Sequence, residues 1–273
     1  MNRFFLLFCL LLPGTVTAEE LNIAVDQQAL AVIYSGQEVM HYSLSWSGGI
    51  KIGDLYLSTA PDDAGDGFVI TARVTDYGLF KLFYPVDDTF TTVVRGPLKL
   101  PCRYQVHQLE ARDMEVRRVT LYDQEAYTVE YRKNDKPPLT YAMAGHAYNE
   151  FSAFFITRAL DLTRKDGQVV PAFVDGKRHE VAVEVLGAEV RDSIFGRIKT
   201  IKVLPKMSFK GLYDKDGDTL FWLTNDACRI PVEIDSKILI GSLVAELVEY
   251  SNAACRSEKK EKRLLLLEEE DLL

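Results

Sequence analysis

Polar and apolar residues alternate along most of the chain between residues 38 and 250. The first clear run covers residues 41–46, and a second run at 50–59 follows the turn residues Ser47, Gly48 and Gly49. This arrangement predicts a β-hairpin, and a change of parity near Gly53 and Asp54 predicts a bulge in its second strand. Strands at similar spacing are typical of an antiparallel sandwich or barrel. Comparable runs cover residues 68–74, 89–95, 103–109, 115–122, 126–132, 171–173, 178–186, 188–193, 199–204, 220–223, 229–234 and 243–250.

One segment has a helical pattern instead. Asn149 is a favourable N-cap residue, and Phe151, Phe154, Phe155 and Ile156 follow at the i, i+3, i+4 spacing of one helix face. We expect this helix to end near residue 162. Its apolar face could pack on a sheet as ordinary core, or it could form a lid over an apolar cavity.

These elements predict an all-β fold. We expect one strongly curved antiparallel sheet that forms an open barrel or spiral, with the short helix packed against it. The alternative is two β lobes divided within residues 135–170, where Pro137 and Pro138 mark a linker. The β-rich domain covers residues 38–250, residues 19–37 lead into it, and residues 251–273 form a charged C-terminal tail.

The N-terminus has the pattern of a secretory signal peptide. Arg3 supplies a positive charge, residues 4–12 are apolar, and Val16, Thr17 and Ala18 are small enough for signal peptidase. The apolar run is shorter than the roughly 20 residues that a transmembrane helix needs. We therefore expect cleavage after Ala18, export to the periplasm and no transmembrane span.

Composition excludes one class of partner. Hydrophobic residues make up 47% of the chain and charged residues 26%, as in ordinary globular proteins, and the formal net charge is −8. Nucleic-acid binding depends on clustered Lys and Arg, so we expect no nucleic-acid partner.

Motifs for catalysis or metal binding are not found. His41, His107, His146 and His179 are not at the spacing of metal ligands, and the chain has no G-x-S-x-G motif. The aspartates at residues 214–218 lack the glycine position and the closing glutamate of an EF-hand, and a hairpin turn explains them. We therefore predict a protein that is not an enzyme and that has no metal or cofactor.

Three cysteines follow the predicted cleavage site, namely Cys102, Cys228 and Cys255. An odd number does not signal a disulfide framework or a zinc site. The strands at 229–234 and 243–250 look like one hairpin, and counting outward from its turn brings Cys228 within a few residues of Cys255. If any disulfide forms, we expect it to join Cys228 and Cys255; otherwise all three thiols are free.

Several motifs together resemble one family of secreted bacterial proteins. They are WSGGIKIG at 46–53, FSAFF at 151–155, FVDGK at 173–177, WLTND at 222–226 and GSLVAEL at 241–247. The family is known as domain of unknown function 3108, and the resemblance covers roughly residues 38–250. It implies export and a β-rich envelope domain of unestablished activity, with no catalytic residues to transfer.

The sequence thus favours an exported, non-catalytic envelope protein that binds a hydrophobic small molecule, a lipid-like ligand or an envelope protein. Candidate ligand-binding residues are Phe151, Phe154, Phe155, Trp46 and Trp222. Two alternatives stay open: a hydrolase acting on envelope polymers, and a structural or assembly factor of the envelope.

Overall fold

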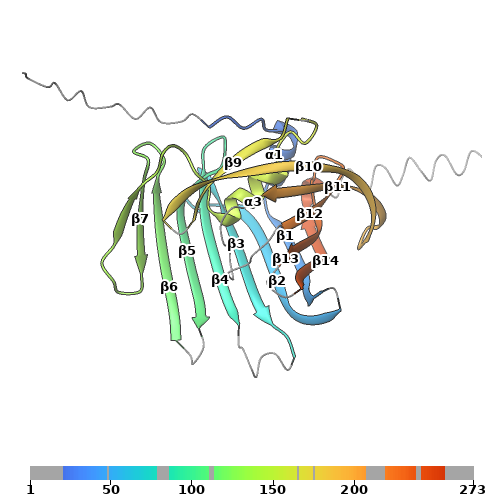
Figure 1. Ribbon diagram of the computed structural model, residues 1–273, viewed down its shortest axis with the longest axis horizontal. Coiled ribbons are helices and arrows are strands. Elements are labelled where there is room, and N and C mark those ends of the chain that lie inside the picture. Colours follow the sequence, from blue (N-terminus) through green and yellow to red (C-terminus); the bar gives the residue numbers. More distant parts are fainter. Residues whose placement is uncertain are drawn as a thin grey trace, which may run out of the picture.

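A computed structural model describes residues 21–47, 49–78, 86–110, 114–164, 166–174, 176–206, 219–237 and 241–255 (Figure 1). The predicted signal peptide, residues 256–273 of the tail and the aspartates at 214–218 lie outside these ranges. The longer helices of the described ranges are α1 (Gln27–Ile33) and α3 (Glu150–Arg158). The strands are β1 (Glu38–Trp46), β2 (Ile50–Pro61), β3 (Gly67–Asp76), β4 (Asp87–Arg95), β5 (Leu100–Glu110), β6 (Met114–Asp123), β7 (Thr128–Lys133), β8 (Leu139–Ala142), β9 (Gln168–Val174), β10 (Lys177–Ser193), β11 (Gly196–Lys206), β12 (Thr219–Thr224), β13 (Pro231–Lys237) and β14 (Ser242–Asn252).

All these strands belong to one 14-stranded sheet with the order β8-β7-β6-β5-β4-β3-β2-β1-β14-β13-β12-β11-β10-β9. The first strand pairs with the last, because Glu38 of β1 lies opposite Asn252 of β14 in an antiparallel ladder. The prediction of a curved antiparallel sheet that is not closed is confirmed, with β8 and β9 as its two ends. The alternative of two β lobes is wrong, because the β1–β14 pair joins both halves of the chain.

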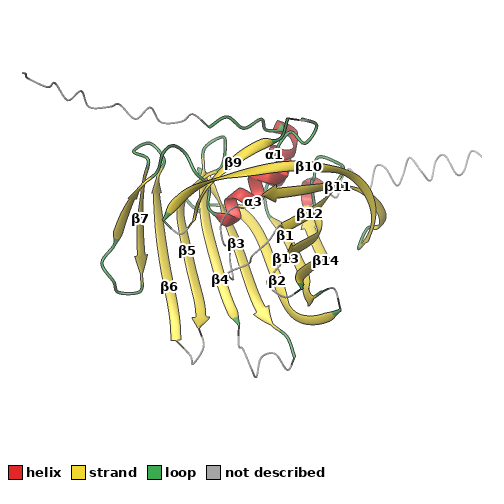
Figure 2. Ribbon diagram, in the orientation of Figure 1, coloured by secondary structure: helices red, strands yellow, loops and turns green. Residues whose placement is uncertain are grey.

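The sheet curls around the helices (Figure 2). In Figure 1, β2–β7 run side by side, whereas β9, β10 and β11 cross over them with α3 in between. The curl brings the end strand β9 back over β6, where the ring centroids of Tyr122 and Phe173 lie 6.3 Å apart. The result is a spiral with an enclosed inner face.

Register shifts interrupt several ladders of the sheet. The ladder between β1 and β2 shifts between Leu44 and Ser45, opposite Gly53 and Lys51, close to the predicted bulge. Gly53 is required there, because a Cβ atom would lie 2.3 Å from the carbonyl oxygen of Thr75. A second shift, at Leu186, lies within β10, so the two strands expected at 178–186 and 188–193 are one strand of 17 residues.

Helix α1 was not predicted. Asp26 caps it by accepting hydrogen bonds from the backbone N–H groups of Gln28 and Ala29. Its buried residues include Leu30 and Ile33, which belong to the main core. The lead-in segment therefore contributes to the hydrophobic core of the domain.

Helix α3 begins where the sequence predicted and ends at Arg158, four residues before the expected end. Asn149 and Ser152 form a capping box at its N-terminus. Its phenylalanines contact both arms of the curled sheet: Phe151 packs on Phe90 of β4, and Phe154 packs on Phe221 of β12, each with ring centroids 5.1 Å apart. The helix is the core element around which the sheet winds.

A buried ion pair fixes the end of α3 to the sheet. The Arg158 guanidinium donates to both carboxylate oxygens of Glu38 on β1, at 2.7 and 2.8 Å, and both side chains are 0% exposed. Arg158 also donates to the carbonyl oxygens of Arg229 and Cys228, and the Tyr250 hydroxyl donates to Glu38. Burial lowers the pKa of Arg158, but the Glu38 carboxylate offsets this and raises it above its ordinary value.

Cys228 and Cys255 form a disulfide, with their Cα atoms 5.9 Å apart. This is the pair that the hairpin count favoured. It ties the residues that follow β14 to the loop before β13. Arg158 donates a hydrogen bond to the carbonyl oxygen of Cys228 in that loop. The third cysteine, Cys102, is free and half-buried.

Candidate functional site

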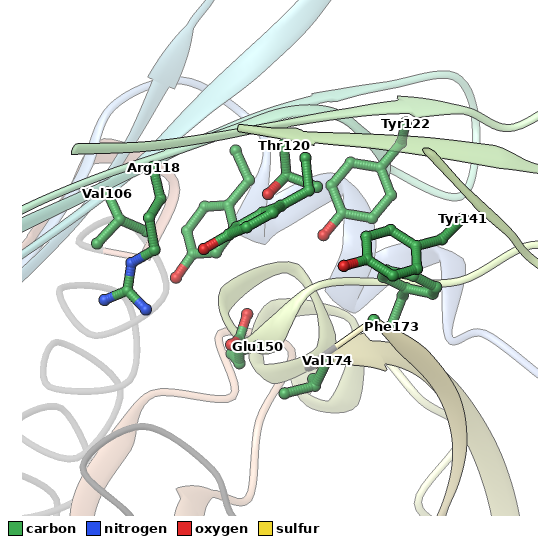
Figure 3. Close-up of a pocket in the computed structure, with 11 residues that line it drawn as sticks. Val106, Arg118, Thr120, Tyr122, Tyr141, Glu150, Phe173 and Val174 are labelled. Atoms are coloured by element: carbon green, nitrogen blue, oxygen red, sulfur yellow. The ribbon is translucent and has the colours of Figure 1, made fainter. Parts of the chain in front are cut away.

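A cavity of about 320 Å³ lies between the inner face of the sheet and the start of α3. In Figure 3, the strands that carry Val106, Arg118, Thr120 and Tyr122 form one side, and the helix beginning at Glu150 faces them. The volume of the cavity is at the lower end of the range of about 300–1,000 Å³ for small-molecule sites. The lining residues are Tyr104, Val106, Arg118, Thr120, Tyr122, Tyr131, Tyr141, Glu150, Phe173, Val174 and Gly176.

Strand register places the tyrosines together. Side chains of alternate residues in a strand point to the same face, and residues directly opposite on neighbouring strands share that face. Thr120 of β6 lies opposite Tyr104 of β5 on one side and Tyr131 of β7 on the other. Tyr122 and Tyr141 lie on the same face. Both are paired with Val129 of β7, which is two residues from Tyr131 and therefore points to the same side of the sheet.

Phe173, Val174 and Gly176, from the end of β9 and the residue before β10, line part of the cavity. Phe173 contacts Tyr122 and Tyr141, with ring centroids 6.3 and 6.0 Å apart. Gly176 has a φ of +74°, and a Cβ atom there would lie 2.9 Å from the Tyr141 ring. A glycine at this position therefore permits the turn and leaves room for the ring.

Two charged groups face the cavity from opposite walls. Arg118 comes from β6, and Glu150 is the first residue of α3 (Figure 3). Burial, and then the Glu150 carboxylate, raise the pKa of the Tyr122 hydroxyl well above its usual value of 10.0. That hydroxyl therefore stays protonated at neutral pH and can donate a hydrogen bond.

None of the five candidates from the sequence lines this cavity. Phe155 is 0% exposed and packs against Tyr34 of the N-terminal segment, with ring centroids 6.3 Å apart. Phe151 and Phe154 are half-buried and contact sheet residues on the two arms. All three lie in the core beside the cavity.

The two tryptophans lie elsewhere. Trp46, at the end of β1, is 40% exposed and lies beside Gly241. Trp222 is buried on the face of β12 opposite to that of Phe221, where its ring contacts the Arg191 and Lys202 cations at 4.4 and 4.9 Å. The structure brings neither ring to the cavity between β6 and α3.

Glu150 is the one carboxylate among the lining residues that the structure describes. Across the described ranges, no group of three or more His, Cys, Asp and Glu side chains is placed to hold a metal ion. The described helices include none with the length and apolar character to cross a membrane. The chemistry of this site is that of tyrosine hydroxyls, aromatic rings and two opposed charges.

Comparison with known proteins relates the chain to proteins whose function is not established. No curated protein matches it. The fold is similar to the crystal structure of a β-barrel-like protein of domain of unknown function DUF1849 from Brucella abortus, with a TM-score of 0.56 and 11% identity. That match covers 80% of this chain and 98% of the other. The model of the protein family of unknown function DUF3108 matches residues 41–248, and the chain therefore belongs to that family.

Proposed function

We propose that this protein is an exported, non-catalytic binding protein of the cell envelope, which holds a small, largely apolar ligand in the cavity between β6 and α3. The observation that carries the proposal is the cavity wall itself. Four tyrosine rings and one phenylalanine ring supply rigid apolar surface, and the tyrosine hydroxyl groups supply a few hydrogen-bonding positions. This mixture is typical of sites that bind small molecules.

The lining disfavours the hydrolase alternative at this site. Most glycoside hydrolases place two carboxyl groups about 5–9.5 Å apart across the scissile bond. Glu150 has no second carboxylate beside it among the described lining residues. A binding role needs no such pair.

Filling the cavity tests the proposal. Thr120 lies in the middle of the wall and is 8% exposed, so Thr120→Phe should block the space. The matched control is Val119→Phe, one residue earlier on β6, where the side chain points to the opposite face. Both variants should keep the wild-type circular dichroism spectrum, since overpacking costs about 1–3 kcal/mol.

The readout is the fluorescence of N-phenyl-1-naphthylamine, a neutral apolar probe. The protein lacking residues 1–18 should enhance the fluorescence, Thr120→Phe should bind the probe about tenfold more weakly or worse, and Val119→Phe should resemble the wild type. The proposal fails if the wild type gives no enhancement, or if the two variants bind the probe equally well.

Export rests on the signal-peptide pattern of residues 1–18. Protein recovered from the periplasmic fraction should begin at Glu19 when its N-terminus is sequenced. Recovery of the full-length chain from the cytoplasm, with none in the periplasm, would contradict this part of the proposal.

A further inference from the structure

Arg118 occupies an unusual position in the cavity wall. Its Nε atom is buried and has no hydrogen-bond partner. Among the described residues, the guanidinium takes part in none of the hydrogen bonds and ion pairs, and Figure 3 shows it pointing away from its strand into the space that faces α3.

Two other arginines of this fold, Arg158 and Arg178, have acceptors for their guanidinium N–H groups. Arg158 is bound by the Glu38 carboxylate and by two carbonyl oxygens. Arg178, near the same cavity, pairs with Glu180 and donates to the carbonyl oxygen of His146. Arg118 has the same donor groups, but the protein supplies no acceptor for them within the described part of the chain.

The neighbours of Arg118 in the ladder supply no acceptor for it. The residue directly opposite on β7 is Lys133, whose side chain is a cation, and the residue directly opposite on β5 is Val106, which is apolar. Residues opposite each other on antiparallel strands share a face, so neither of these two neighbours accepts a hydrogen bond from the guanidinium.

A guanidinium that lacks an acceptor in the protein is suited to bind an anionic group of a ligand. Its N–H groups form a planar fork that matches a carboxylate or a phosphate with two parallel hydrogen bonds. A partly buried site strengthens such a pair, because water screens it less.

Glu150 lines the cavity on the helix side. A second anionic group placed on the ligand beside this carboxylate is disfavoured, because like charges repel each other. Most of the remaining wall consists of aromatic rings, Val106 and Val174, which favour an apolar body.

We propose that the ligand is a mono-anionic amphiphile whose carboxylate or phosphodiester head binds Arg118 and whose apolar body lies along the tyrosine wall. This inference rests on the proposed function and specifies the class of ligand for the same cavity.

The test uses three probes with the same twelve-carbon chain: dodecanoate, the phosphodiester methyl dodecyl phosphate and the neutral dodecanol. The two anions each carry a single negative charge at neutral pH. All three are measured by displacement of N-phenyl-1-naphthylamine, the anions below their critical micelle concentrations and dodecanol below its solubility limit. The wild type should bind at least one of the two anions about tenfold or more tightly than dodecanol, as expected for a charge-assisted hydrogen bond. Whichever anion binds more tightly identifies the head group as carboxylate or phosphodiester.

The variants separate the role of Arg118 from a general effect of charge. Arg118→Gln should lose the preference for the anion and keep the affinity for dodecanol, and Arg118→Lys should keep part of the preference. Arg117→Gln is the matched control, because Arg117 is the preceding residue on β6, is 71% exposed in its side chain and pairs with Glu115. It should bind all three probes as the wild type does.

The measured affinities distinguish a failure of this inference from a failure of the proposed function. Equal affinity of the wild type for the anions and dodecanol, or an unchanged preference in Arg118→Gln, overturns the role of Arg118 and leaves the cavity as a neutral binding site. If the wild type binds neither the naphthylamine nor any of the three probes, both proposals are wrong.

Discussion

Replacing Glu38 by Gln keeps the shape of the side chain but removes the charge that pairs with Arg158. Both side chains are completely buried, so the guanidinium cannot turn to water for a new partner. Breaking one partner of a buried ion pair costs about 3–5 kcal/mol, because it leaves an uncompensated charge in a medium of low polarity. A domain of this kind has a total stability of about 5–15 kcal/mol, so Glu38→Gln should remove a large part of it.

The assay is urea unfolding followed by far-ultraviolet circular dichroism, with the disulfide kept oxidised. With a urea dependence of about 2–3 kcal/mol per molar, the expected loss moves the midpoint down by about 1–2.5 M. The matched control is Asp87→Asn, which breaks a second two-point arginine–carboxylate pair, with Arg73, on the surface. Both partners there are about half exposed, so its loss should cost at most about 1 kcal/mol.

A double substitution checks the cause. Glu38→Leu combined with Arg158→Met removes both charges at once, and hydrophobic replacement of a whole buried pair is often neutral. The double variant should therefore be more stable than Glu38→Gln. The reasoning is refuted if Glu38→Gln lowers the midpoint no more than Asp87→Asn does, or if the double variant is the least stable of the set.

Two further predictions concern stability. Cys228→Ser opens a disulfide across a sequence separation of 27 residues and should cost about 3.5 kcal/mol in urea unfolding, whereas Cys102→Ser should change little; equal effects would contradict the assignment. Burial raises the pKa of Asp54, but hydrogen bonds from Lys51 and His41 outweigh it and hold the pKa below its ordinary value of 3.8. This contribution is present above pH 3.8 and is lost as the pH falls through the folded-state pKa, so the midpoints of the wild type and Asp54→Asn should converge in acid; a constant gap from pH 6 to pH 3 would contradict it.

The elements with a strong local signal could be predicted from the sequence. Asn149 and the spacing of Phe151, Phe154 and Phe155 indicated α3, and the alternation of residues 41–46 and 50–59 indicated the hairpin that begins the sheet. Helix α1 has seven residues, and Leu30 and Ile33 are too few to establish a helical period. Packing against the curled sheet therefore supplies the stability that the local sequence does not reveal.

The cavity could not be predicted, because it depends on contacts between distant segments. Tyr104 and Thr120 face the same space through strand register, and Phe173 reaches them after the chain has passed through α3. The alternating tyrosines of residues 104–141 were a usable signal, since polar aromatic residues at inward positions suggest a site more than a filled core. The aromatic face of α3 was the more obvious pattern, but the structure places it in the core beside the cavity.

Native mass spectrometry of the protein purified from the periplasmic fraction tests the central claim most directly, because it detects a bound ligand without choosing one in advance. The wild type and Val119→Phe should each carry an additional mass of a small molecule, which lipid analysis can then identify, and Thr120→Phe should lack it. A wild-type protein with no bound mass, or a Thr120→Phe variant that retains the same mass, would contradict the account of this cavity as a ligand-binding site.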